Sequence, residues 1–186
     1  MIIITVTCLV SLIVAVLIAA YHFILLAVTF LRKSDFQQGP VSRYHSFAII
    51  IPAHNEEQVI MHTLKSCKGL EYPEDKYRII VIADSCTDKT ADLVRSYGCE
   101  CLERFDEKDR GKGFALTWAF ERVLSNDFDA VLVLDADCLI ERQSLQIFNA
   151  HLNKGMKVLQ ANYIASNPND SSQSYVFAVG NYLENQ

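Results

Sequence analysis

Two carboxylates, one residue apart, follow an apolar run in the second half of the chain. Residues 130–134 are apolar, and Asp135 and Asp137 come directly after them. A carboxylate at the end of a buried strand costs free energy unless a cation, a hydrogen-bond donor or water offsets it. Hard ions such as Mg2+ and Mn2+ prefer oxygen ligands, and Mg2+ is commonly held by one or two carboxylates plus substrate phosphates. The pair therefore predicts half of a metal and phosphate site.

Polar residues also follow two earlier apolar runs. Pro52 to Glu57 come after the run at 47–51, and Asp84 to Asp88 come after the run at 77–83. In parallel sheets, ligands collect beyond the carboxyl ends of the strands. A single aspartate there is often a helix cap or a turn residue. Three such segments together favour a binding site at one edge of a sheet.

A basic loop could supply the groups that meet phosphate. In the segment Lys108-Asp-Arg-Gly-Lys-Gly113, two glycines let the backbone come close to a ligand, and Arg110 and Lys112 can meet phosphate oxygens. Without the nearby carboxylates, a solvated basic turn would be the better interpretation. It lacks the glycine pattern of a P-loop, and no G-x-G-x-x-G follows the first run.

The elements that must position these residues alternate along the chain. Apolar runs rich in Ile and Val predict strands over 47–51, 77–83 and 130–134, buried on both faces, with weaker candidates at 99–105 and 157–164. Amphipathic stretches predict helices over 56–68, 87–97, 114–124, 144–153 and 172–183. Asn55 is the expected N-cap of the first of these, and Gly69, Gly98 and Gly155 mark helix ends. The alternation predicts an α/β domain with a mostly parallel sheet covered by helices.

The first 31 residues predict a transmembrane helix. No charged side chain occurs between Ile2 and Leu31, and thirty helical residues span about 45 Å, more than the ~30 Å hydrocarbon core. Arg32 and Lys33 follow directly, so the positive-inside rule places the remainder in the cytoplasm. We therefore expect a signal anchor at 1–33, a linker at 34–46 and one domain over 47–186, at the cell membrane.

Charge and cysteine content narrow the classes of function. From Ser34 onward, 15 Lys and Arg residues face 22 Asp and Glu residues, which argues against nucleic acid as a partner. Cys99 and Cys101 form a C-x-C without a second pair at zinc-site spacing, so free thiols in a reducing compartment are expected.

The ordered motifs resemble the family-2 glycosyltransferases with a GT-A fold, especially membrane-bound relatives of cellulose, chitin and hyaluronan synthases. The matching pieces are IIPAHNEE (50–57), IADSCTDKT (82–90), RGKGFAL (110–116) and DAD (135–137). The resemblance implies inverting transfer from a nucleotide sugar, usually a UDP-sugar, to a glycan or lipid-linked acceptor. It assigns the donor to Pro52, Ala53, His54, Asn55, Glu56, Asp84, Arg110, Lys112 and Asp135, and a Mg2+ or Mn2+ ion to Asp137 together with Asp135.

One part of the family pattern is absent. The family's catalytic base is a carboxylate downstream of the metal motif, commonly in a Glu-Asp pair, and after Asp137 only Glu141, Asp170 and Glu184 occur, in no such motif. The base is therefore expected beyond Gln186, and the chain is interpreted as the donor-binding part of a longer enzyme. Two alternatives stay open: a membrane-tethered nucleotide-sugar-binding module without activity, and a phosphatase that uses an Asp-x-Asp pair.

Overall fold

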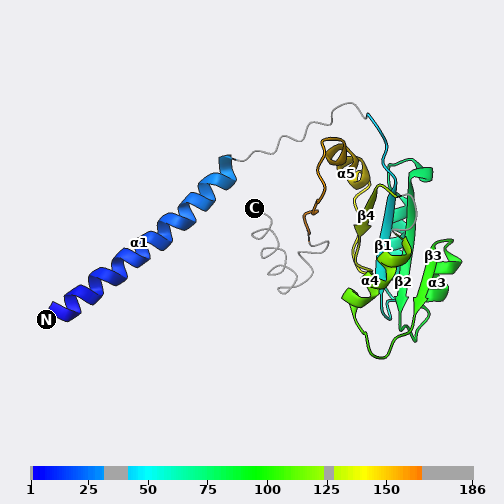
Figure 1. The fold of residues 1–186 in the computed structure, drawn as a ribbon, viewed down its shortest axis with the longest axis horizontal. Coiled ribbons are helices and arrows are strands. Elements are labelled where there is room, and N and C mark those ends of the chain that lie inside the picture. Colours follow the sequence, from blue (N-terminus) through cyan, green and yellow to red (C-terminus); the bar gives the residue numbers. More distant parts are fainter. Residues whose placement is uncertain (1, 32–41, 124–127, 165–186) are drawn as a thin grey trace. The chain divides into compact units, whose positions relative to one another are not determined.

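A computed structural model of the 186-residue chain describes residues 2–31, 42–123 and 128–164. The first element, α1 (Ile2–Leu31), is one continuous helix, as the sequence predicts (Figure 1). Its described side chains are almost all exposed, and by length and composition residues 5–27 could cross a membrane. The remaining elements belong to a separate compact unit, residues 38–159.

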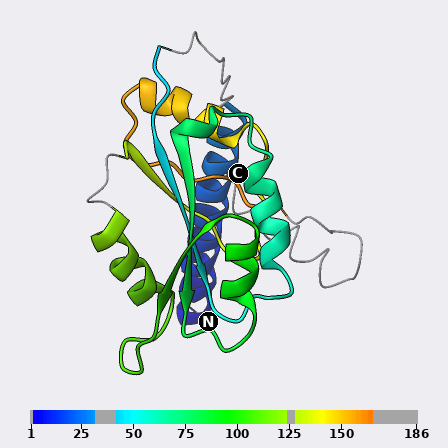
Figure 2. The ribbon, with the colours of Figure 1, turned by 90° about the vertical axis from the view of Figure 1, so that its right-hand side faces the viewer.

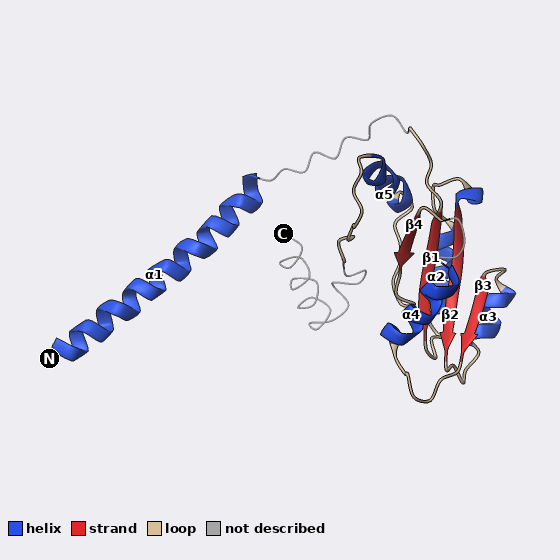
Figure 3. Ribbon diagram, viewed as in Figure 1, coloured by secondary structure: helices blue, strands red, loops and turns tan. Residues whose placement is uncertain are grey.

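That unit is built on a four-stranded parallel sheet. The strands are β1 (Phe47–Ala53), β2 (Tyr77–Asp84), β3 (Glu100–Arg104) and β4 (Ala130–Val133). Their order is β3-β2-β1-β4, and all arrows in Figure 3 point the same way. The chain moves outward from β1 to β3 and then returns to the other side of β1. The strand order therefore reverses between β1 and β4, which is where open α/β sheets bind ligands.

Helices cover both faces of this sheet. They are α2 (Ile60–Lys68), α3 (Thr90–Ser96), α4 (Lys112–Val123) and α5 (Ser144–Asn153), with a short 3-10 turn η1 (Glu74–Lys76). Figure 2 shows α4 on one side of the sheet and α2 and α3 on the other. The α/β prediction is confirmed.

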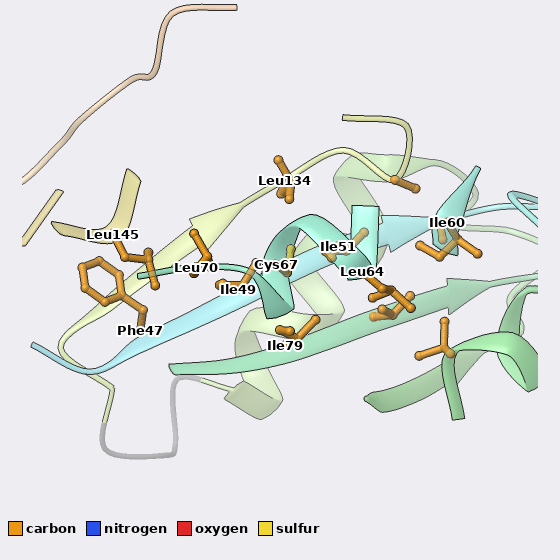
Figure 4. Close-up of a cluster of buried hydrophobic side chains, with 14 of the residues drawn as sticks. Phe47, Ile49, Ile51, Ile60, Leu64, Cys67, Leu70, Ile79, Leu134 and Leu145 are labelled. Carbon is orange, nitrogen blue, oxygen red and sulfur yellow. The ribbon is translucent and has the colours of Figure 1, made fainter. Parts of the chain in front are cut away.

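Alternate residues of β1 serve two hydrophobic cores. Ile49 and Ile51 pack with α2, α3 and α5, and Figure 4 shows this cluster. Ala48 and Ile50 point the other way and pack against α4. Because successive side chains in a strand point to opposite faces, a strand covered on both faces must be apolar throughout.

Several sequence expectations are wrong in detail. Residues 157–164 form no strand, because no strand in the described part of the chain takes up their backbone hydrogen bonds, and Val158 and Ile164 are more than 80% exposed. The strand β4 is an edge strand and only half-buried, rather than buried on both faces. The predicted helix at 172–183 lies outside the described residues.

Asn55 is not a helix N-cap. The first helix begins at Ile60, with Val59 at the cap position, and Asn55 lies in the preceding loop with a φ of +57°. Its side chain instead accepts a hydrogen bond from the Thr87 backbone N–H, at 2.8 Å. The loops after β1 and β2 bind each other, and both helices that follow therefore start a few residues later than predicted.

Residues 42–46, within the predicted linker, are attached to the domain. The His45 backbone N–H donates to Asn149 Oδ1 at 2.9 Å, and the Ser46 backbone N–H donates to Asp129 Oδ2 at 2.8 Å.

Candidate functional site

A cleft of about 1050 Å³ opens at the carboxyl ends of the strands. Its volume is at the upper end of the range for small-molecule sites, roughly 300–1,000 Å³. Segments following all four strands contribute to it, and the start of α4 closes one side. The cleft is lined by every residue that the sequence predicts for the donor or the metal: Pro52, Ala53, His54, Asn55, Glu56, Asp84, Arg110, Lys112, Asp135 and Asp137.

The loop after β1 is held in place by the loop after β2. The backbone N–H of Glu56 donates to Thr90 Oγ1 at 2.8 Å, and that of Glu57 donates to Asp88 Oδ2 at 3.0 Å. Asp88 Oδ1 in turn accepts from the Thr90 backbone N–H at 2.9 Å. Asp88, which the sequence places at the rim, therefore holds the loops together and does not line the cleft.

His54 and Asp84 line the cleft and link the ends of β1 and β2. His54 Nδ1 lies 2.7 Å from the Asp84 carbonyl oxygen, so the tautomer with a proton on Nδ1 donates this hydrogen bond. The Asp84 side chain is only 10% exposed and accepts a hydrogen bond at Oδ1 from Arg104, 2.8 Å away. A carboxylate this buried is stabilised by such a partner.

The basic loop meets the carboxylate pair across the cleft. Lys112 Nζ forms an ion pair with Asp135 Oδ1, although the two residues are 23 positions apart. Arg110 lines the same side. The sequence predicts this proximity only through the shared sheet edge, and the structure establishes the contact.

Asp135 and Asp137 are the two carboxylates of a potential metal site. Ligand atoms of Asp135, Asp137 and Cys138 lie within 4.8 Å of one another. Burial, followed by the charges of Asp137 and Asp135, raises the pKa of the Cys138 thiol to about 11, so the thiol stays protonated near neutral pH. Two carboxylates without a competing thiolate suit a hard, oxygen-binding cation, and the donor set fits Mg2+ or Mn2+.

A buried hydrogen bond fixes the turn between the two carboxylates. The Thr63 hydroxyl on α2 donates to the Ala136 carbonyl oxygen at 2.6 Å, and both residues are at most 5% exposed. The sequence gives no indication of this contact, because the partners are 73 positions apart.

Sequence reasoning also missed part of the cleft lining. The segment between β3 and α4 contributes Phe105, Asp106 and Glu107, and Phe105 is 69% exposed. The available signal in the sequence was an aromatic residue at the end of a predicted strand, directly before two acidic residues. Five further lining residues lie within the predicted site segments but were not assigned to the donor or the metal: Ser85, Thr87, Gly111, Ala115 and Ala136.

Comparison with known proteins identifies the family of this chain. The family model for glycosyl transferase family 2 matches residues 48–182. Probable glycosyltransferase YdaM of Bacillus subtilis is 30% identical over 141 residues, which cover 67% of this chain and 32% of YdaM. A 4,4'-diaponeurosporenoate glycosyltransferase of Staphylococcus aureus is 34% identical over 119 residues, which cover 63% of this chain and 31% of the enzyme. The chain thus spans about a third of the length of the curated relatives it matches.

Solved structures show the same fold. The mannosyltransferase PcManGT from Pyrobaculum calidifontis, in complex with GDP-Man and Mn2+, superposes with a TM-score of 0.60 at 24% identity, over 90% of this chain and 48% of that one. S. aureus TarS 1–349 superposes with a TM-score of 0.52 at 22% identity, over 63% of this chain and 39% of that one. The sheet and helices are accordingly those of a GT-A fold. With the family model covering most of its length, the chain belongs to glycosyl transferase family 2.

Proposed function

We propose that the cleft binds a nucleotide-sugar donor, most simply a UDP-sugar, together with Mg2+ or Mn2+, for inverting transfer to an acceptor hydroxyl. The observation that carries the proposal is the convergence in one cleft of residues from four segments that are far apart in the sequence. The lining includes the carboxylates of Asp84, Asp135 and Asp137. Arg110 and Lys112 supply positive charge to the same cleft.

Each group has a chemical role in this proposal. Asp84, at the buried end, accepts a hydrogen bond from the base, while Pro52 to Glu56 surround the nucleoside. Arg110 and Lys112 bind the diphosphate, because guanidinium and ammonium groups pair with phosphate oxygens. Asp137, with Asp135, holds the cation. A bound divalent cation supplies neutralisation of the charge that develops on the leaving diphosphate.

In this proposal, Lys112 and Asp135 pair with each other in the free protein and with the diphosphate and the cation in the complex. Without a ligand, the ammonium of Lys112 compensates the charge of Asp135. A cation arriving with a diphosphate offers each side chain a new partner of opposite charge, so neither is left unpaired. Both side chains are partly exposed, which lets them reorient without breaking the core.

The carboxylates and the metal are tested together by nucleotide binding. Calorimetry on the full chain in detergent should show UDP binding that Mn2+ or Mg2+ strengthens at least tenfold, about 1.4 kcal/mol. Asp137→Asn should abolish that enhancement. The matched control is Asp75→Asn, the same loss of charge at an exposed residue of η1 outside the cleft. UDP binding that is independent of metal and unchanged in Asp137→Asn would refute the metal site.

The acceptor side is not assigned to any residue. Comparing this chain with a version extended by downstream sequence, in an assay of sugar transfer from a panel of UDP-sugars, decides between an enzyme and a binding module. A base contributes roughly 10²–10⁴ in rate, so the extended version should transfer far faster if it supplies that base. Donor binding without transfer in either version would favour the binding module.

The helix α1 is proposed to anchor the domain at the cytoplasmic face of the cell membrane, in the manner of the polysaccharide synthases that the motifs resemble. Its apolar, exposed surface and the following Arg32 and Lys33 support this orientation. An impermeant thiol reagent added to intact cells should label Cys86 only after the membrane is opened. Labelling of Cys86 in sealed cells would contradict the orientation.

A further inference from the structure

A buried arginine lies behind the cleft. Arg104 is the last residue of β3, and its side chain is 5% exposed. Among the residues that the structure describes, Arg104 and Asp84 are the only charged residues that are buried. A buried guanidinium is costly unless its donors are paired. The hydrogen-bond partners of Arg104 therefore show which parts of the cleft this residue holds in place.

Arg104 joins two walls of the cleft. Its Nη1 donates to Asp84 Oδ1 at 2.8 Å, and its Nη2 donates to Asp106 Oδ2 at 3.2 Å and to the Asp109 carbonyl oxygen. Its own carbonyl oxygen accepts from the Ser85 backbone N–H at 2.7 Å. One side chain thus fixes both the carboxylate at the end of β2 and the loop that leads into α4.

This pairing gives the Asp84 carboxylate a direction. An ionised carboxylate only accepts hydrogen bonds, and Oδ1 already accepts from Arg104. Among the described residues, Oδ2 has no hydrogen-bond partner in the protein, and Asp84 lines the cleft. A ligand in the cleft therefore meets one fixed acceptor that needs a donor.

Nucleobases differ in what they present to such an acceptor. Uracil and guanine carry a ring N–H, whereas cytosine and adenine carry an unprotonated ring nitrogen, which is itself an acceptor. We propose that Arg104 is a positioning residue, which directs Asp84 so that the cleft selects nucleotides whose base has a ring N–H. The inference rests on the proposed function, since it requires that the cleft bind a nucleotide. An acceptor left facing an acceptor should weaken binding about 10- to 100-fold.

The test measures base selectivity with the full chain in detergent. Dissociation constants for UDP and CDP, which differ only in the base, are determined in the presence of Mn2+ by calorimetry. The wild-type protein should bind UDP at least tenfold more tightly than CDP. Arg104→Met, which keeps much of the side-chain length but removes the charge, should bring that ratio close to one, mainly through weaker UDP binding. Arg104→Lys keeps the charge but cannot hold both partners, and should give an intermediate ratio.

A control separates positioning from a structural role. Arg95 on α3 forms an exposed ion pair with Glu103 of β3. Arg95→Met therefore makes the same substitution at an ion pair outside the cleft and should leave the ratio unchanged. If Arg104 were only structural, its variants would weaken UDP and CDP by the same factor. An unchanged ratio in Arg104→Met overturns the inference; if that variant does not fold, an unchanged ratio in Arg104→Lys does so.

The wild-type protein also distinguishes failure of the inference from failure of the proposed function. Equal binding of UDP and CDP would overturn the inference alone and leave a nucleotide site. Binding of neither nucleotide would overturn the proposed function, and the inference with it.

Discussion

Thr63→Val removes a hydrogen bond that joins the core to the carboxylate pair. The Thr63 hydroxyl is the partner of the Ala136 carbonyl oxygen, which lies between Asp135 and Asp137. Valine has nearly the same shape but no donor. Because both Thr63 and Ala136 are buried, water cannot replace the lost hydroxyl.

The expected cost follows from the geometry. A buried carbonyl left without a donor costs about 1–3 kcal/mol. A carbon atom needs about 3.3 Å from an oxygen, whereas the hydroxyl lies at 2.6 Å, so the carbonyl must also move by roughly 0.7 Å. The added methyl group offsets at most about 0.8 kcal/mol through apolar burial. The net loss in the free energy of unfolding should be about 1–2 kcal/mol.

Urea unfolding of the full chain in detergent measures this loss. Trp118, on α4, is the only tryptophan and packs against the core between α4 and the sheet, so its fluorescence reports unfolding of the domain. Thr117→Val is the matched control, because Thr117 is exposed on α4, and should change stability by less than about 0.5 kcal/mol. Movement of the carbonyl should also weaken the Mn2+ enhancement of UDP binding. Equal stability of Thr63→Val and Thr117→Val would refute the reasoning.

Three further predictions concern a thiol, a carboxylate and a loop. Burial and neighbouring carboxylates raise the pKa of Cys138 to about 11, so iodoacetamide should alkylate the Cys138 thiol slowly at neutral pH in metal-free buffer. An alkylation rate equal to that of Cys138 in the urea-unfolded chain would contradict the raised pKa. Hydrogen bonding from the Ser46 backbone lowers the pKa of Asp129 below 3.8. The contribution of Asp129 to the free energy of unfolding is therefore full above pH 3.8 and is lost as the pH falls through the lower pKa of the folded state. Urea titrations at several acid pH values should show a weaker acid dependence of stability in Asp129→Asn than in the wild-type protein. Gly111→Ala should destabilise the domain by about 1–2 kcal/mol in urea unfolding, since Gly111 has a φ of +104°. Gly113→Ala, within α4, should instead stabilise the domain by about 0.5–1 kcal/mol. Equal effects of the two substitutions would show that backbone conformation is not the cause.

The sequence alone determined the two central strands and the edge of the sheet at which the candidate site residues gather. The continuous apolar runs at 47–51 and 77–83 identify β1 and β2, because a strand that is buried on both faces is apolar at successive positions. Their parallel direction then places the segments beginning at Pro52 and Asp84 together. These inferences need only the local pattern of apolar residues and the rule that ligands bind at the carboxyl ends of parallel strands.

Only the tertiary structure decided which groups contact one another. The run at 130–134 is as apolar as the others, yet β4 lies at the sheet edge, because strand order depends on which surfaces pack and not on composition. Asn55 has the chemistry of a helix cap, but the Thr87 N–H of a neighbouring loop takes its side-chain oxygen. Arg104 looks like an ordinary charged residue at the end of a weak strand. It becomes the partner of Asp84 because the pairing of β2 with β3 sets Asp84 opposite Arg104, where the guanidinium, removed from water, must find its acceptors inside the protein.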